Sequence, residues 1–121
     1  MRNEARIHRG RVSQAWLAAY LRPRGFPLAG SAGLYEAGSD IPGLPSMDGV
    51  PGLSIEVKAT SAEGTLLKAL RQSVEDAKGG LPVVVWRPNG YGAARIEDWV
   101  VAIRLRDAVP LWRDAGYGDP V

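Results

Sequence analysis

The most constraining feature of the chain is the alternating stretch at residues 53–58, which reads Leu-Ser-Ile-Glu-Val-Lys. Successive side chains of a β-strand point to opposite faces, so Leu53, Ile55 and Val57 can enter a core while Glu56 and Lys58 share the other face. The stretch therefore predicts a strand that presents a carboxylate and an ammonium group side by side. Such a pair is a candidate site for a metal ion and a phosphate.

Length and composition limit the class of protein. The 121 residues fit one domain spanning residues 1–121, and the contents of 45% apolar and 23% charged residues argue against disorder. No apolar run approaches the roughly 18 residues that a membrane span needs, and the start of the chain carries no apolar signal region. We therefore expect a soluble, cytoplasmic protein with no membrane partner.

The residue types that are missing restrict the chemistry. The chain has no cysteine and one histidine, His8, so disulfides, thiolate chemistry and a site with several histidines are excluded within one chain. A bound metal would have to be held mainly by oxygen, which favours Mg²⁺ or Mn²⁺. We expect no organic cofactor.

Positive charge is concentrated at the start of the chain. Residues 1–24 contain six arginines and one glutamate, a net charge of +5, while residues 25–121 carry a net charge of −3. Arg6, Arg9 and Arg11 crowd the start of an expected helix, where positive charge opposes the helix dipole. A phosphate partner would explain these arginines, and a solvated helix face is the alternative.

Hydrophobic periodicity and turn residues predict a small α/β sandwich. The expected elements are a helix over 6–21, a short strand over 34–41 that opens a hairpin with an enlarged tip, the strand 53–58, a helix over 66–77 stopped by Gly79-Gly80, a buried strand over 82–86, a strand over 99–105 and a short helix over 106–112.

Phosphodiester cleavage requires a metal to polarise the phosphate, a nucleophilic water and stabilisation of the developing charge. Asp40 and Glu56 can supply carboxylate ligands, and Lys58 can position the water or neutralise charge. An ordinary solvated strand face remains the alternative for Glu56 and Lys58. Asp48 competes with Asp40, which we prefer because two glycines and a proline separate Asp48 from the strand.

Gly38-Ser39-Asp40-Ile41, a hairpin and then Ile55-Glu56-Val57-Lys58-Ala59 resemble the PD-(D/E)xK nuclease superfamily, in particular the small Holliday-junction-resolvase-like proteins of bacteriophages. The resemblance implies a restriction-endonuclease-like αβββαβ core, with a central mixed sheet flanked by helices. It also implies a DNA endonuclease of recombination that depends on Mg²⁺ or Mn²⁺, working in the host cytoplasm if a phage encodes it. Asp40, Glu56 and Lys58 would be its catalytic residues, and Asp40, Glu56 and the Val57 carbonyl its metal ligands.

The sequence departs from this pattern on the first helix. Related resolvases often carry a glutamate there that completes the metal site, whereas this chain has Gln14. A neutral amide adds no charge, so either the metal affinity is lower or Glu4 or Glu36 takes over.

Further candidates follow from position. Gln72 is a candidate catalytic residue, because several nucleases of this class place a glutamine on the corresponding helix. The turn after Trp86 combines charge, amide and ring in Arg87, Asn89 and Tyr91, which suits DNA contact. The candidate DNA-binding residues are Arg6, Arg9, Arg11, Gln14 and Arg87.

Symmetric cleavage of a junction needs two sites, so we expect a homodimer. The first helix or the C-terminal strand with its tryptophan could form its interface. Two alternative functions are compatible with the same fold. One is a nicking or flap nuclease of DNA repair or replication, and the other is a DNA-binding module with weak or no catalysis.

Overall fold

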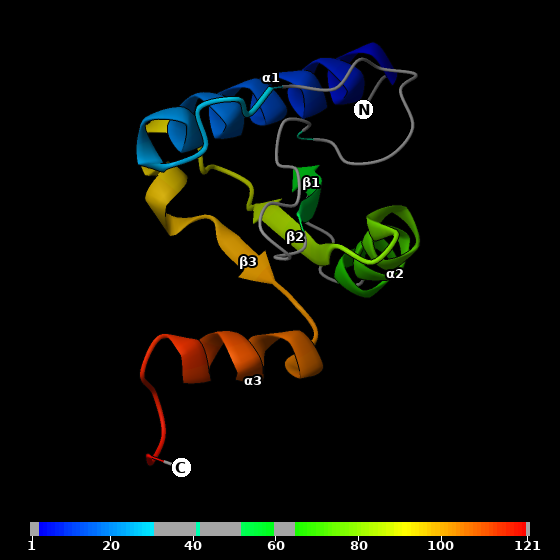
Figure 1. The fold of residues 1–121 in the computed structure, drawn as a ribbon. Helices are drawn as coiled ribbons and strands as arrows, with labels where there is room; N and C mark the ends of the chain where they lie inside the picture. Colours follow the sequence, from blue (N-terminus) through cyan, green and yellow to red (C-terminus); the bar gives the residue numbers. More distant parts are fainter. Residues whose placement is uncertain (1–2, 31–40, 42–51, 60–64, 121) are drawn as a thin grey trace.

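The computed structural model describes residues 3–30, 41, 52–59 and 65–120, with the side chains of residues 3–7 left out (Figure 1). The helices are α1 (Asn3–Leu21), α2 (Thr65–Ala77) and α3 (Leu105–Asp114), and the strands are β1 (Leu53–Ala59), β2 (Leu81–Arg87) and β3 (Val100–Ala102). Two short 3-10 helices, η1 (Arg22–Arg24) and η2 (Ala93–Asp98), lie between them. Within the described residues, no helix has the length and apolar character needed to cross a membrane.

The strands form a mixed sheet in the order β1-β2-β3. β1 and β2 are parallel, with Glu56 beside Val84 and Lys58 beside Trp86, while β3 runs antiparallel to β2. Parallel neighbours need a crossover connection, and α2 lies within the one that joins them. The predicted fold class, α/β with a central mixed sheet flanked by helices, is confirmed.

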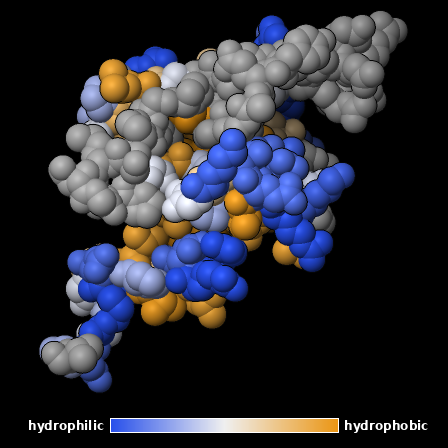
Figure 2. All heavy atoms as spheres, turned by 45° about the vertical axis from the view of Figure 1, so that its right-hand side comes forward, coloured by the Kyte–Doolittle hydropathy of each residue, from blue (hydrophilic) through white to orange (hydrophobic). Residues whose placement is uncertain are grey.

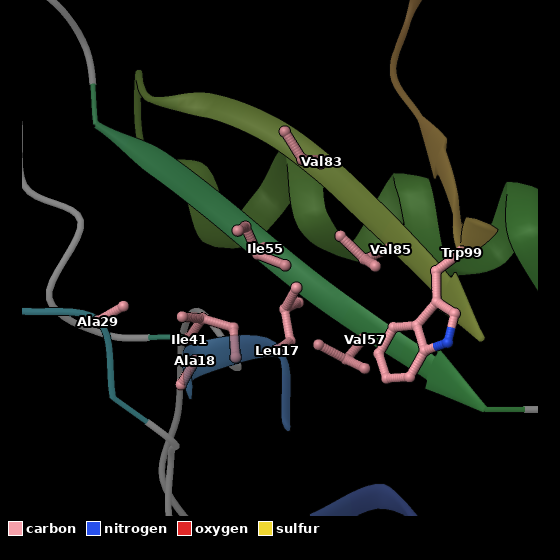
Figure 3. Packing of buried hydrophobic residues seen from close by; sticks show 9 residues of the cluster. All are labelled: Leu17, Ala18, Ala29, Ile41, Ile55, Val57, Val83, Val85 and Trp99. Atoms are coloured by element: carbon pink, nitrogen blue, oxygen red, sulfur yellow. The ribbon is translucent and has the colours of Figure 1, made fainter. Parts of the chain in front are cut away.

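The core lies between the sheet and α1 (Figure 3). Ile55 and Val57 of β1 are 4% and 8% exposed, and they pack with Val83 and Val85 of β2 against Leu17 and its neighbours on α1. The predicted alternation is therefore confirmed, since the odd-numbered side chains of β1 enter the core. Ser54, Glu56 and Lys58 project to the opposite face, which α2 covers.

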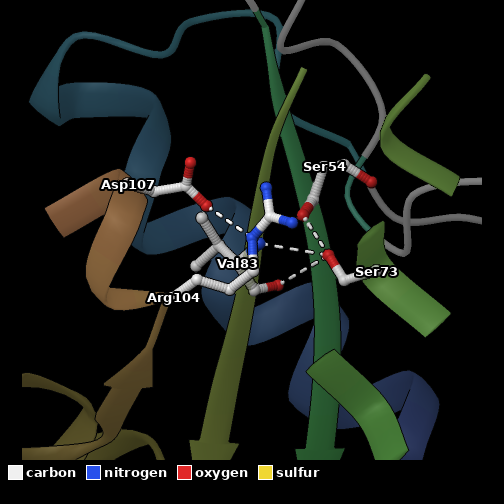
Figure 4. A network of polar contacts seen from close by, with 5 residues as sticks. All are labelled: Ser54, Ser73, Val83, Arg104 and Asp107. Carbon is white, nitrogen blue, oxygen red and sulfur yellow. Dashed lines mark hydrogen bonds and ion pairs between the residues drawn. The ribbon is translucent and has the colours of Figure 1, made fainter. Parts of the chain in front are cut away.

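Ser73 fixes α2 to that second face (Figure 4). Its side chain is buried, and its hydroxyl donates to the Ser54 carbonyl at 2.8 Å while accepting from the Val83 amide at 3.1 Å. One hydroxyl thus bonds to both parallel strands. A hydroxyl has one donor and two acceptor positions, so it can bond to both strands at once. These bonds fix the position of α2 along the sheet.

The return from α2 to β2 needs a glycine. The Gly80 amide donates to the Ala77 carbonyl and the Leu81 amide to the Gly52 carbonyl, both at 2.8 Å. A Cβ atom on Gly80 would lie 2.8 Å from the Gly52 carbonyl oxygen, so a side chain there would collide with the backbone that enters β1.

The elements agree with most of the sequence-based expectations. Helices α1 and α2 and strands β1 and β2 are confirmed, with ends that differ by a few residues. The strand expected over 99–105 is wrong in length, because β3 ends at Ala102 and α3 already begins at Leu105. The Arg104 carbonyl accepts from the Asp107 and Ala108 amides, and the Arg104 side chain pairs with Asp107 at 2.9 Å, which starts a helix there. The expected strand 34–41 and its hairpin fall almost wholly outside the described residues.

Candidate functional site

Glu56 and Lys58 form an ion pair on the α2 face of β1. The Lys58 Nζ atom lies 3.5 Å from the Glu56 Oε1 atom, and the two side chains are 38% and 13% exposed. A carboxylate buried to this degree is stable only when charge or hydrogen bonds compensate its lost hydration, and Lys58 supplies positive charge. The pair thus combines a sheltered carboxylate, which can act as a metal ligand, with an ammonium group that reaches solvent.

The geometry follows from the strand. Residues two apart on a β-strand point the same way and lie about 7 Å apart along it, which a glutamate and a lysine side chain can bridge. Both side chains lie in the second half of β1, toward its carboxyl end. In open α/β sheets, the crevice outside the carboxyl ends of parallel strands is the usual location of a ligand.

A second group of polar residues lies at the same end of the sheet. Arg9 of α1 donates from Nε to the Ala59 carbonyl at 3.2 Å and from Nη2 to the Asn89 Oδ1 atom at 3.1 Å. Arg87, the last residue of β2, donates from Nη1 to the Ser13 hydroxyl at 3.0 Å and from Nε to the Tyr91 carbonyl at 2.5 Å. We refer to Arg9 and Arg87 as the arginine cluster.

No carboxylate among the four hydrogen-bond acceptors of Arg9 and Arg87 balances the positive charge of the arginine cluster. All four acceptors are neutral: two backbone carbonyls, one amide and one hydroxyl. Burial, followed by the charge of Arg9, lowers the pKa of Arg87 from its ordinary value. A guanidinium nevertheless stays protonated at neutral pH, so two like charges face the end of the sheet.

Aromatic rings hold Arg87 in place. Its guanidinium carbon lies 4.8 Å from the centre of the Trp16 ring and 5.9 Å from that of Trp99. The Ser13 hydroxyl that accepts from Arg87 also donates to the Arg9 carbonyl at 2.7 Å. Arg87 thereby connects β2, α1 and the segment between β2 and β3, and this structural role accompanies any role in binding.

The sheet register brings the pair and the cluster to one edge. Lys58 lies beside Trp86, and Ala59, whose carbonyl binds Arg9, lies beside Arg87. The ion pair projects toward the α2 face, whereas the arginine cluster lies on the α1 side. Both groups lie toward the carboxyl ends of β1 and β2.

The other predicted residues are distributed around these groups. Gln72 is exposed on α2 and donates to the Asp76 Oδ1 atom at 3.2 Å. Gln14 is half-buried on α1, in the layer opposite Glu56, and Arg11 is exposed on the same helix. Arg6 and Glu4 belong to the first part of α1, where side chains are not described. Asp40, Asp48 and Glu36 lie outside the described residues.

The described residues do not hold a complete metal site. Within residues 3–30, 41, 52–59 and 65–120, no group of three or more histidine, cysteine, aspartate or glutamate side chains is arranged to bind a metal ion. Glu56 therefore offers one carboxylate, and Asp40, the expected partner, is not described.

Sequence reasoning missed the role of Ser13. This residue is fully buried in α1, one turn before Leu17, and accepts from a guanidinium 74 positions away in the chain. The available signal was a polar residue on the apolar side of a helix, which is a position that a buried hydroxyl occupies when a hydrogen-bond partner faces it. Trp99 belongs to the core and Trp16 packs against it, and the rings of both also lie near the Arg87 guanidinium.

Comparison with protein-family models, curated proteins and solved structures finds no match for this chain.

Proposed function

We propose that the chain is a divalent-metal-dependent DNA endonuclease of the PD-(D/E)xK type that hydrolyses phosphodiester bonds in branched DNA such as a Holliday junction. The observation that carries the proposal is the Glu56–Lys58 pair, at 3.5 Å on one face of β1 near the carboxyl ends of two parallel strands. The resemblance of residues 38–41 and 55–59 to the nuclease motif, seen in the sequence, supports the same assignment.

Glu56 fits a hard cation such as Mg²⁺ or Mn²⁺. Its carboxylate is mostly sheltered but not closed off, at 13% exposure, and Mg²⁺ is commonly bound by one or two carboxylates with water and phosphate oxygens as the other ligands. Asp40 and the Val57 carbonyl would be the further ligands. When bound, the metal would act as a Lewis acid on the phosphate and lower the pKa of the attacking water.

Lys58 has two roles in this proposal. Its ammonium group is placed beside the acidic ligand and reaches solvent, so it can neutralise charge on the phosphate oxygens and orient a water molecule. A fixed positive charge in a partly dehydrated site stabilises a developing negative charge without having to reorganise. Gln72, on the helix that covers the same face, is the proposed accessory residue.

The arginine cluster supports a nucleic-acid substrate. Arg9 and Arg87 have only neutral acceptors in the described part of the chain, so a phosphodiester would compensate their charge. Phosphate contacts of this kind position a protein on DNA but do not read its sequence. The cluster fits the backbone of DNA that passes the carboxyl edge of the sheet, with Arg6, Arg11 and Gln14 of α1 as further contacts.

A DNA-binding module with weak catalysis is the second candidate. It is favoured by one observation, that residue 14 is a glutamine rather than an acid. A nicking or flap nuclease with the same site is distinguished from a resolvase only by its substrate.

The test is cleavage of end-labelled four-way junction, flap and linear duplex DNA, with Mg²⁺, with Mn²⁺ and with chelator. We expect metal-dependent cutting, fastest on the junction, and a rate for Glu56→Gln that is about 1,000-fold lower. Glu97→Gln is the matched control, because Glu97 is exposed on η2 and should leave the rate unchanged.

Three outcomes would decide against parts of the proposal. Junction cutting that survives Glu56→Gln would remove Glu56 from the site. Faster cutting of flaps than of junctions would favour the repair or replication nuclease. DNA binding without cutting, together with no calorimetric signal for either metal, would favour the binding module.

A further inference from the structure

A tyrosine ring and a guanidinium group are stacked in the segment between β2 and β3. The guanidinium carbon of Arg95 lies 3.8 Å from the centre of the Tyr91 ring, which fits a guanidinium that rests on the ring face. The Tyr91 ring is partly buried and packs against the core, whereas the Arg95 side chain is 52% exposed. A ring anchored in the core thus supports a guanidinium at the surface.

Asp98 offsets the charge of this guanidinium. Its Oδ2 atom lies 3.7 Å from the Arg95 Nε atom, three residues along η2, and its side chain is exposed. Such a pair adds little stability, but it lowers the net positive charge that Arg95 can offer to a phosphate. What remains is a flat group on a ring, and nucleic-acid bases stack on aromatic side chains and on guanidinium planes.

Tyr91 joins this stack to the arginine cluster. Its carbonyl oxygen accepts from Arg87, and its amide donates to the Pro88 carbonyl at 3.1 Å, which closes a turn. Asn89, in the same turn, accepts from Arg9, and η2 packs against α1 (Figure 1). Two cations with neutral acceptors therefore adjoin a flat surface. A nucleotide requires both groups, cations for its phosphate and a plane for its base.

Other exposed rings lie apart from the arginine cluster. Trp112 and Tyr117 are exposed at the C-terminal end of the chain, where Figure 2 shows hydrophobic atoms along the margins of α3 and Figure 1 shows this helix beyond β3, away from α1. Arg24 stacks on Tyr20 at 3.7 Å, but at the end of α1, where it donates to the Tyr20 carbonyl. Tyr20 is eleven residues from Arg9 on this helix, or roughly 16 Å at 1.5 Å per residue.

We propose that Tyr91 and Arg95 form a platform for one unpaired DNA base, with the phosphate of that nucleotide held by Arg9 and Arg87. The inference rests on the proposed function and narrows its substrate. A base inside a continuous duplex is stacked on both sides and cannot reach a side chain, whereas a bulge, a gap or a distorted branch point offers a free base. The platform selects unpaired nucleotides without reading their sequence, because every base has a flat face.

The test compares two DNA duplexes that differ in one group. One carries a single bulged nucleotide, and the other carries an abasic residue at the same position, with the sugar and phosphate retained. Affinities are measured by fluorescence anisotropy in the presence of chelator, so that no strand is cut. We expect the wild-type chain to bind the bulged base about tenfold more tightly, which is the effect of one stacked base.

Three variants separate stacking from charge. Arg95→Lys keeps the charge and removes the plane, so it should lose the tenfold preference while the slope of affinity against salt stays unchanged. Tyr91→Leu, which keeps an apolar side chain against the core, should lose the preference as well. Arg24→Lys removes the other stack, at the end of α1, and is the matched control that should retain the preference.

Equal affinity of the wild-type chain for both duplexes would overturn the inference, and the proposed function would still stand if junctions are cut. A preference that survives Arg95→Lys would overturn it too, because the base would then stack elsewhere. Competition by a free nucleoside monophosphate at the concentration of the bulged duplex would assign the platform to free nucleotides instead of DNA. A chain that neither binds nor cuts any DNA would refute the proposed function and this inference together.

Discussion

Replacement of Ser73 by alanine should destabilise the protein by about 2 kcal/mol. The hydroxyl is 1% exposed and makes two hydrogen bonds, at 2.8 Å to the Ser54 carbonyl and at 3.1 Å from the Val83 amide. Alanine removes both bonds without adding volume, and a buried polar group that loses its partner costs ~1–3 kcal/mol. For a domain of this length, a loss of this size lowers the melting temperature by about 6–10 °C.

Urea unfolding followed by circular dichroism measures the change. The midpoint should fall at an unchanged slope, because the surface exposed on unfolding stays the same. Gln72→Ala is the control: Gln72 is the adjacent residue, is exposed, and makes one hydrogen bond to Asp76, so its removal should change the free energy of unfolding by less than about 0.5 kcal/mol. A Ser73→Ala protein as stable as the Gln72→Ala protein would refute the role assigned to the hydroxyl.

Three further predictions test the turn at Gly80, the proposed role of Lys58 and the arginine cluster. Gly80→Ala should cost about 1–3 kcal/mol in thermal or urea unfolding, since its Cβ would lie 2.8 Å from a backbone oxygen, whereas Gly92→Ala, with no atom within 4 Å, should be tolerated. Lys58→Met should slow DNA cleavage about 100-fold while calorimetric binding of Mn²⁺ persists; an unchanged rate would exclude its proposed role. Arg9→Ala should weaken DNA binding and reduce the slope of affinity against salt by about one, whereas Arg106→Ala should leave the slope unchanged.

The sequence predicts the secondary structure well where periodicity is strong. Alternation placed Ile55 and Val57 in the core and Glu56 and Lys58 on the opposite face, because the side-chain period of a strand leaves one choice once the apolar face is known. The boundary between β3 and α3 was predicted wrongly. Residues 99–105 continue an extended apolar pattern, and the change to helix depends on the bonds between Arg104 and Asp107.

The arginine cluster shows what the sequence alone could not provide. Arg87 was a candidate for DNA contact, but its partners Ser13 and Trp16 lie more than 70 positions away, on a helix whose packing against the sheet is a tertiary property. Local pattern and propensity do not encode which turn of α1 faces the end of β2. Residues near in sequence were therefore predictable as a pair, whereas residues brought together by packing were not.

The measurement that most directly tests the central claim is the anomalous diffraction of Mn²⁺ in a crystal of the protein. The account predicts a peak within coordination distance, about 2.2 Å, of a Glu56 carboxylate oxygen, on the face of β1 that also carries Lys58. It also predicts that the peak disappears in the Glu56→Gln variant. A peak at another group of carboxylates, or no peak near Glu56 with DNA bound, would contradict the assignment of this strand as the metal-dependent site.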